Sequence, residues 1–119
     1  MKLEVGMYVK TKNGYICKII NVNDFREPNM KYGVEANYLK DVMFIGDDDV
    51  VKASYNIIDI LEVGDYVNGY PIYEIVEYED DTRAIVIDDD NKSIIWKKQD
   101  IKSVVTHEQM EQMAYKVGE

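Results

Sequence analysis

Apolar and polar residues alternate over short runs along this chain. The clearest runs are Ile16–Val22 and Ile72–Tyr78, which are rich in β-branched and aromatic residues. Alternation over a few residues, bounded by Gly, Asn and Asp, is typical of strands with one buried face. Turn signals recur roughly every 8–12 residues. The pattern therefore predicts a mostly β protein with about five short strands in each half.

The first part of the chain is repeated later. Residues 3–9 (LEVGMYV) recur as residues 61–67 (LEVGDYV), with six of seven positions identical at a spacing of 58 residues. The triplet Asn-Gly-Tyr follows each copy, at 13–15 and at 68–70. Internal similarity of this kind indicates a duplicated structural unit.

Later segments of the two halves suggest a further correspondence. In the first half, Val42–Ile45 and Val50–Val51 flank residues 46–49 (GDDD). In the second half, Ala84–Ile87 and Ile94–Trp96 flank residues 88–91 (DDDN). Each set predicts two strands joined by an acidic turn, a hairpin signal. A short polar step and a closing strand are expected next, at 57–60 in the first half and 101–105 in the second.

This order of parts resembles that of an SH3-like barrel. We therefore expect two tandem small SH3-like barrels, at residues 1–60 and 61–105. The first would carry a long irregular loop at 23–40. Halves of this size are marginal alone and no spacer separates them, so we expect them to pack together. Residues 106–119 predict a short helix at about 107–114, begun by a capping box of Thr106 and Gln109, and then an extended tail at 115–117.

Charge and composition narrow the classes of partner. The formal net charge is −9, which disfavours direct binding to nucleic acid and favours a basic partner. The alternative is that the acidity only keeps the chain soluble. No apolar run has the length of a membrane span, the N-terminus lacks a signal peptide, and Cys17 is the single cysteine. We therefore expect a cytoplasmic protein that does not bind membranes.

Few residues offer reactive chemistry. His107 is the one histidine, and spacing assembles no catalytic constellation around it, so we interpret it as a solvated residue at the helix start. Cys17 is expected to face the core. One Cys and one His cannot make a four-ligand zinc site, and Asp47–Asp49 and Asp88–Asp90 are interpreted as turn residues. We expect no enzyme, and no catalytic residue, cofactor or metal.

Tyrosine is the informative excess, with ten in the chain. Tyr combines apolar area with a polar tip and is enriched at interfaces, although strands also favour it for packing. In the second half, tyrosines lie beside acidic residues, a combination that could imitate the phosphates of nucleic acid. The candidate binding residues are Tyr66, Tyr70, Tyr73, Tyr78 and Trp96, together with Glu77, Glu79, Asp80, Asp81, Asp88, Asp89 and Asp90.

Three stretches resemble a family of small phage and prophage proteins from low-GC Gram-positive bacteria. They are residues 56–70 (NIIDILEVGDYVNGY), the opening 3–12 (LEVGMYVKTK), and the tail 100–106 (DIKSVVT) with 115–117 (YKV). The family supplies no catalytic or binding residues. The resemblance implies a phage-borne accessory protein inside a bacterial host cell, where small acidic phage proteins often inhibit host defence, as anti-CRISPR and anti-restriction proteins do.

The leading hypothesis is a stoichiometric inhibitor or adaptor that binds a basic, nucleic-acid-binding host protein. A second is a small-ligand binder that sequesters a nucleotide signal, for which Lys97 and Lys98 beside Trp96 are the one suggestive cluster. A third is an accessory or assembly role in the virion. The sequence leaves the target, the binding face and the oligomeric state open, and it allows a homo-oligomer.

Overall fold

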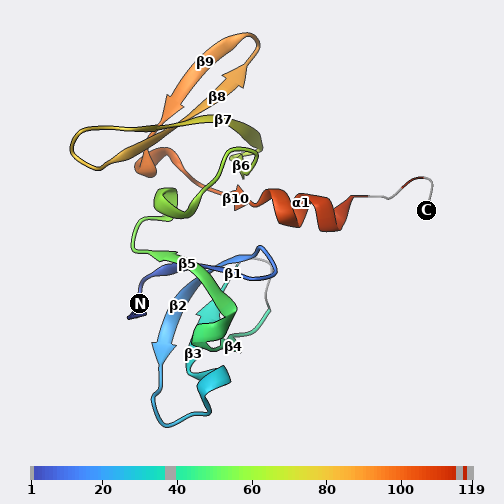
Figure 1. Cartoon of the computed structure of the whole chain (residues 1–119). Coiled ribbons are helices and arrows are strands. Elements are labelled where there is room, and N and C mark those ends of the chain that lie inside the picture. The colour runs from blue at the N-terminus through green and yellow to red at the C-terminus, as the bar shows by residue number, and fades with distance from the viewer. Residues whose placement is uncertain (1, 37–39, 115–116, 118–119) are drawn as a thin grey trace. The chain divides into compact units, whose positions relative to one another are not determined.

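The computed structural model describes residues 2–36, 40–114 and 117 (Figure 1). The protein is mostly β, with two five-stranded antiparallel sheets and one short C-terminal helix. The chain divides into two compact units, Met1–Ile60 and Leu61–Glu119, each of which contains one sheet. None of the helices in the described ranges has the length and apolar character that crossing a membrane requires.

Each unit has five strands and at least one 3-10 turn, and the second unit ends in the helix. The first unit contains β1 (Tyr8–Thr11), β2 (Ile16–Val22), β3 (Tyr32–Glu35), β4 (Met43–Ile45) and β5 (Val50–Ser54), with η1 (Pro28–Met30), η2 (Asp47–Asp49) and η3 (Ile57–Ile60). The second unit contains β6 (Tyr66–Val67), β7 (Tyr70–Glu77), β8 (Arg83–Asp89), β9 (Lys92–Trp96) and β10 (Val104–Val105), with η4 (Lys98–Asp100) and α1 (His107–Met113).

Both sheets have the same strand order. In the first unit the order is β5-β1-β2-β3-β4, and in the second it is β10-β6-β7-β8-β9. Counted within each unit, this is 5-1-2-3-4 in both cases, so the sequence repeat reflects a repeated topology. A 3-10 turn precedes the last strand in each unit, η2 before β5 and η4 before β10.

The expected alignment of the later segments is wrong for the first half. The two strands flanking residues 46–49 do not form a hairpin, because β4 pairs with β3 and β5 pairs with β1, at opposite edges of the sheet. The acidic turn η2 therefore corresponds to η4 and not to the tip of the second hairpin. The two turns contain the same hydrogen bond from a backbone N–H to an Asp side chain. Gly46 N–H donates to Asp49 Oδ2 in η2, and Lys97 N–H donates to Asp100 Oδ2 in η4, both at 2.9 Å.

Two further expectations for the first half are also corrected. Residues 57–60, expected as the closing strand, form the 3-10 turn η3, and the last strand of the unit is β5, at the edge of an open sheet. The expected loop at 23–40 contains η1 and the strand β3, although residues 37–39 lie outside the described part. Gly33 explains the missed strand, because glycine is a turn signal, whereas here it lies within β3 between the buried Tyr32 and Val34.

The second half follows its predicted pattern more closely. The hairpin of β8 and β9 is confirmed, and its two-residue turn, Asp90-Asn91, has φ of 48° and 66°. Positive φ at both positions is the type I′ geometry that suits the twist of a hairpin. The helix α1 and its capping box of Thr106 and Gln109 are confirmed too. The expected extended tail falls partly on residues 115–116, outside the described ranges.

The repeated LEVG segment makes the same turn in both units. Gly6 and Gly64 have φ of 95° and 97°, a conformation that only glycine adopts without strain. Their N–H groups donate to the second strand of each unit, Gly6 to Ile19 O at 2.8 Å and Gly64 to Ile72 O at 3.1 Å. The turn therefore fixes where the first strand of each unit begins.

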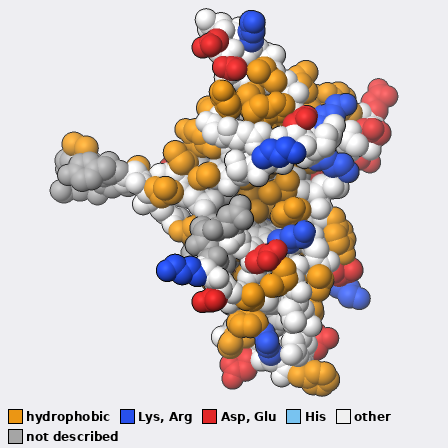
Figure 2. All heavy atoms as spheres, turned by 180° about the vertical axis from the view of Figure 1, so that it is seen from behind, with side chains coloured by type: hydrophobic (Ala, Val, Ile, Leu, Met, Phe, Trp, Pro, Cys, Tyr) orange, Lys and Arg blue, Asp and Glu red, His pale blue; other side chains and the backbone are white. Residues whose placement is uncertain are grey.

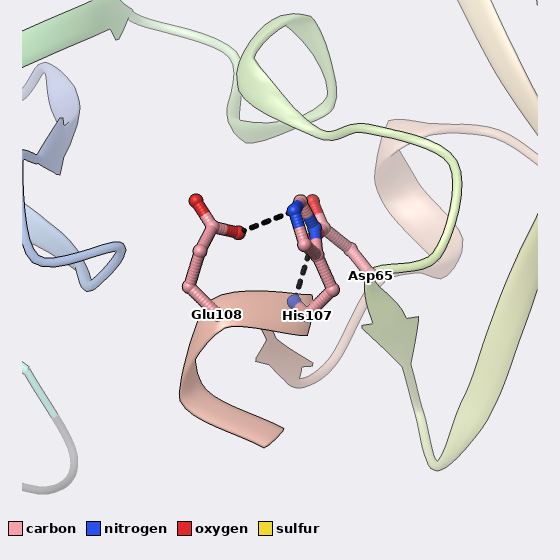
Figure 3. A group of neighbouring side chains, drawn as sticks. All are labelled: Asp65, His107 and Glu108. Carbon is pink, nitrogen blue, oxygen red and sulfur yellow. Dashed lines mark hydrogen bonds and ion pairs between the residues drawn. The ribbon is translucent and has the colours of Figure 1, made fainter. Parts of the chain in front are cut away.

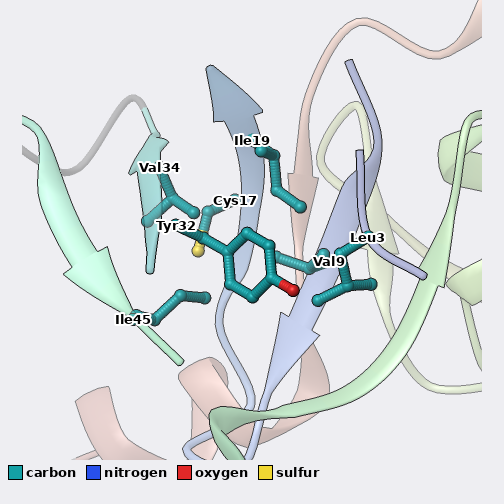
Figure 4. Packing of buried hydrophobic residues seen from close by; sticks show 7 residues of the cluster. All are labelled: Leu3, Val9, Cys17, Ile19, Tyr32, Val34 and Ile45. Carbon is teal, nitrogen blue, oxygen red and sulfur yellow. The ribbon is translucent and has the colours of Figure 1, made fainter. Parts of the chain in front are cut away.

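Strand register builds the core of the first unit (Figure 4). Val9 lies opposite Cys17, Ile19 opposite Val34, and Tyr32 opposite Ile45. With Leu3 these residues form one buried cluster, so Cys17 is a core residue, as expected. The hydroxyl of the buried Tyr32 donates to Asp47 Oδ1 at 2.6 Å. Burial, followed by this contact with Asp47, raises the pKa of Tyr32 above its ordinary value.

The core of the second unit centres on β8. Residues 84–87 of this strand are all buried, so both of its faces are covered along that stretch. Ile87 lies opposite Ile72 of β7 and Ile94 of β9, and Ile85 lies opposite Ile75 and Trp96. Burying one Ile side chain contributes about 1.5–3 kcal/mol.

A matched pair of isoleucines tests this core. Ile85→Ala should lower the free energy of unfolding by about 2–5 kcal/mol, because it leaves a cavity at a side chain with 0% exposure. Ile95→Ala, at a side chain on the next strand that is 55% exposed, should cost less than about 1 kcal/mol. Denaturant titration followed by fluorescence of Trp96, the one tryptophan, measures both. Equal losses for the two variants would contradict the assigned core.

Candidate functional site

The negative charge is concentrated in the second unit. Residues 61–119 contain 14 acidic and 6 basic residues, whereas residues 1–60 contain 9 acidic and 8 basic ones. Almost the whole formal net charge of −9 therefore belongs to the second unit. An electrostatic attraction for a basic partner would act through this unit.

The predicted acidic residues form two separate groups. Residues 77 and 79–81 lie at the turn from β7 to β8, and residues 88–90 lie where β8 turns into β9 (Figure 1). The seven residues of β8 separate the two groups by about 20 Å. The structure therefore does not bring all the predicted acidic residues to one place.

The first group surrounds a shallow hollow beside Tyr78. This Tyr78 hollow is lined by Glu77, Tyr78, Glu79, Asp80, Thr82 and Lys97. The ring of Tyr78 is 41% exposed, and Lys97 Nζ lies 6.0 Å from its centroid. The hollow thus combines an accessible aromatic ring with charged groups of both signs, which suits recognition of a protein surface.

Two of the carboxylates at the hollow already have partners within the unit. Glu77 Oε1 accepts from Arg83 Nη2 at 2.7 Å and from Nε at 3.0 Å. Asp80 Oδ1 accepts from the hydroxyl of Thr82 at 2.6 Å and from its N–H at 3.1 Å. These bonds lower the pKa of Asp80 below its ordinary value, the hydroxyl contributing most. Glu77 and Asp80 therefore shape the turn as well as supply charge.

The predicted aromatic residues are distributed over the sheet. Tyr70 and Trp96 meet edge to face, with ring centroids 5.9 Å apart, so packing accounts for part of both rings. Tyr66 is half-buried in β6. Tyr73 is 67% exposed, the largest value among the predicted tyrosines. Tyr70, Tyr73 and Tyr78 are therefore the exposed tyrosines of the set, and of these Tyr70 also packs against Trp96.

One face of the molecule, shown in Figure 2, carries hydrophobic side chains among acidic and basic ones. Exposed apolar side chains of the second unit include Ile95, at 55%. A surface of this kind can bury apolar area and pair charges in the same contact.

The structure corrects part of the interpretation of His107. It is the first residue of α1, as expected, but its ring is only 39% exposed, because Asp65 and Glu108 lie at its two nitrogens (Figure 3). Glu62 also lies near Nε2. Nδ1 lies 2.7 Å from Asp65 Oδ1, and Nε2 lies 2.9 Å from Glu108 Oε1 and 3.9 Å from Glu62 Oε2. One imidazole therefore lies among three carboxyl groups. We name these four residues the His107 cluster.

Asp65 is the centre of this cluster. Its side chain is 0% exposed, and Oδ1 accepts from the backbone N–H of His107 at 2.9 Å while Oδ2 accepts from the backbone N–H of Glu62 at 2.8 Å. A carboxylate only accepts hydrogen bonds, so the 2.7 Å contact places a hydrogen on His107 Nδ1. Asp65 thus joins the LEVG turn to the first residue of α1 and fixes the orientation of the imidazole ring.

Sequence reasoning missed this cluster, although the repeat carries a signal for it. The seven-residue repeat differs at one position, where the first copy has Met7 and the second has Asp65. In the first unit, Glu4 N–H donates to Met7 Sδ at 3.3 Å, the counterpart of the bond from Glu62 to Asp65. Asp65 therefore lies in the second unit, where its carboxyl group binds the first residue of α1.

No protein-family model, curated protein or solved structure matches the sequence.

Replacing Asp65 tests its role at the start of α1. Asp65→Ala leaves the N–H groups of Glu62 and His107 without their acceptor, and each buried unsatisfied donor costs about 1–3 kcal/mol. We expect the free energy of unfolding to fall by at least about 1–3 kcal/mol, the cost of one such donor. Amide exchange in α1 should become faster. Glu111→Ala, an exposed position on the same helix, should change stability by less than about 0.5 kcal/mol. A loss no larger than that of the control would contradict the role of Asp65.

Proposed function

We propose that the protein is a binding protein that occupies a basic surface of another protein in a stoichiometric complex. The observation that carries the proposal is the position of the charge, because the second unit holds 14 acidic and 6 basic residues together with the exposed Tyr73 and Tyr78. Opposite charge accelerates association and selects the partner, whereas aromatic rings supply most of the affinity. A nucleic-acid-binding protein is the partner class that presents such a basic surface.

The resemblance to phage proteins makes this proposal more specific. An acidic surface that covers the nucleic-acid cleft of a host protein would prevent that protein from binding DNA or RNA. We therefore propose a host defence protein as the target, in the manner of an anti-CRISPR or anti-restriction inhibitor. This step rests on the resemblance and on charge, and it assigns no catalytic residue.

We further propose that each unit is an open variant of the SH3-like barrel. The shared strand order 5-1-2-3-4 and the 3-10 turn before the last strand support this assignment. Barrels and sheets of this kind often present a binding surface between their loops, where side chains can vary without loss of the core. The Tyr78 hollow lies at one such loop.

The structure gives less support to nucleotide binding. Lys97, a residue of the suggested cluster, lines the Tyr78 hollow together with Glu77, Glu79 and Asp80. A phosphate group bound at Lys97 in this hollow would be repelled by these carboxylates. The carboxylates around Lys97 therefore weaken its attraction for the phosphate of a nucleotide signal.

Capture experiments test the proposed partner class. The tagged full chain is mixed with lysate of a low-GC Gram-positive bacterium at low salt, and bound protein is eluted with a salt gradient. We expect a basic nucleic-acid-binding protein, whose binding to DNA or RNA falls as the chain is added up to one equivalent. A recovered protein that keeps its nucleic-acid binding in excess chain would contradict the inhibitor proposal.

Charge neutralisation identifies the surface that binds this partner. Replacing Asp88, Asp89 and Asp90 with Asn should weaken binding in calorimetry and reduce its dependence on salt, because the charge of the second unit falls. The matched control replaces Asp24, Glu27 and Glu35 with Asn, Gln and Gln, which removes the same charge from the first unit. Equal weakening by both triple variants would show that net charge alone acts, without a defined surface.

The Tyr78 hollow is tested by tyrosine truncation. Tyr78→Ala should weaken binding of the recovered partner about tenfold or more, because aromatic side chains are frequent hot spots at interfaces. Tyr55→Ala is the control, since Tyr55 is 53% exposed and belongs to the first unit. Unchanged affinity for Tyr78→Ala would place the contact elsewhere on the second unit.

A further inference from the structure

We propose that the His107 cluster is a binding site for a divalent transition-metal ion of the zinc class. The ligands would be His107 Nε2 and one carboxylate oxygen each from Glu108 and Glu62. Asp65 would hold the imidazole ring through Nδ1 without touching the ion. This proposal is independent of the proposed partner binding.

The spacing of the ligand atoms fits one ion. Zinc lies about 2.0–2.2 Å from nitrogen and oxygen ligands, so two ligands of one ion are separated by about 3–4 Å. Nε2 lies 2.9 Å from Glu108 Oε1 and 3.9 Å from Glu62 Oε2. Both carboxylates therefore approach the same ring nitrogen, Glu108 at a distance that suits a shared ion and Glu62 at one that a movement of its side chain would have to shorten. The ligand atoms of His107 and Glu108 lie, with that of Asp65, within 4.8 Å of one another. His107, Glu108 and Glu62 are 31–39% exposed, which leaves room for water as a further ligand.

The orientation of the ring also fits a metal ligand. Histidines that bind metals usually donate their second ring N–H to a carboxylate, which fixes the tautomer and strengthens the ligand nitrogen. Asp65 performs this role at 2.7 Å, and its own position is fixed by the N–H groups of Glu62 and His107. Nε2 is thereby presented toward Glu108 (Figure 3), and it also lies 3.9 Å from Glu62 Oε2.

The charge of the cluster favours a cation. Three carboxyl groups lie around one imidazole, and even a protonated ring would leave two negative charges in excess. Oε1 of Glu108 is itself buried, and Asp65 is 0% exposed, so water does not screen this excess fully. A divalent cation at Nε2 would reduce the excess of these four side chains to one negative charge.

Ligand type selects the class of ion. An imidazole nitrogen with carboxylate oxygens suits Zn²⁺, Co²⁺ and Ni²⁺, whereas Ca²⁺ and Mg²⁺ prefer oxygen ligands alone. Because Glu62 precedes β6 and Glu108 belongs to α1, a bound ion would connect the LEVG turn to the helix. Its expected effect is to stabilise the C-terminal helix.

Titration of the metal-free full chain with ZnCl₂, in calorimetry and thermal unfolding, tests the site. We expect one equivalent of Zn²⁺ to bind and to raise the unfolding temperature, while MgCl₂ and CaCl₂ at the same concentrations have no effect. Co²⁺ should give the visible absorption of a site with nitrogen and oxygen ligands. Glu108→Gln and His107→Gln should each weaken Zn²⁺ binding at least about tenfold.

Glu111→Gln is the matched control, since it removes one carboxylate from the exposed part of the same helix. It should bind Zn²⁺ as the unchanged protein does. Circular dichroism confirms that each variant is folded, and Glu108→Gln keeps the capping box of Thr106 and Gln109. Stoichiometric binding that Glu108→Gln and His107→Gln leave unchanged, or no Zn²⁺ binding by the unchanged protein, would overturn the proposal. Neither result bears on partner capture, which tests the proposed function separately.

Discussion

A fully buried carboxyl group must have hydrogen-bond donors, and the second unit is organised around this constraint. Asp65 has 0% exposure, and its oxygens accept from the backbone of Glu62, the backbone of His107 and the His107 ring. These donors belong to two segments more than 40 residues apart in the sequence, so satisfying Asp65 holds the LEVG turn and α1 together. Burial makes this connection strong, because a buried donor or acceptor without a partner is costly.

The same constraint explains how one repeated fold carries two different units. Both units begin with the same glycine turn and have the same strand order. The first has Met7 where the second has Asp65, and only the second unit ends in an α-helix within the described residues. Charge follows the same division, since the second unit has the acidic excess. The two units thus share a scaffold, and the second differs from the first in the features on which the proposed binding depends.

Much of the fold could be predicted from local pattern. The strands β2, β8 and β9 and the capped helix α1 follow alternation, turn residues and capping residues that act within a few positions of each other. The failures lie in the first half, where β3 was missed, residues 57–60 are a 3-10 turn, and the pairing of β4 and β5 was wrong. Residues 46–49 look like a hairpin turn, yet η2 carries the chain from one sheet edge to the other because β5 pairs with β1. A local pattern can indicate that two strands exist, but it cannot indicate which strands pair across the sheet.

The candidate sites show the same division between sequence and tertiary structure. The sequence by itself determined the duplication, the strands β2, β8 and β9, the acidic character and the set of tyrosines, because composition and short-range periodicity encode them. Only the tertiary structure decided that the acidic residues form two groups at opposite ends of β8, and that His107 meets Asp65, Glu108 and Glu62. The physical reason is that side-chain contacts over long separations depend on strand register and on the path of the chain between elements, which no short segment specifies.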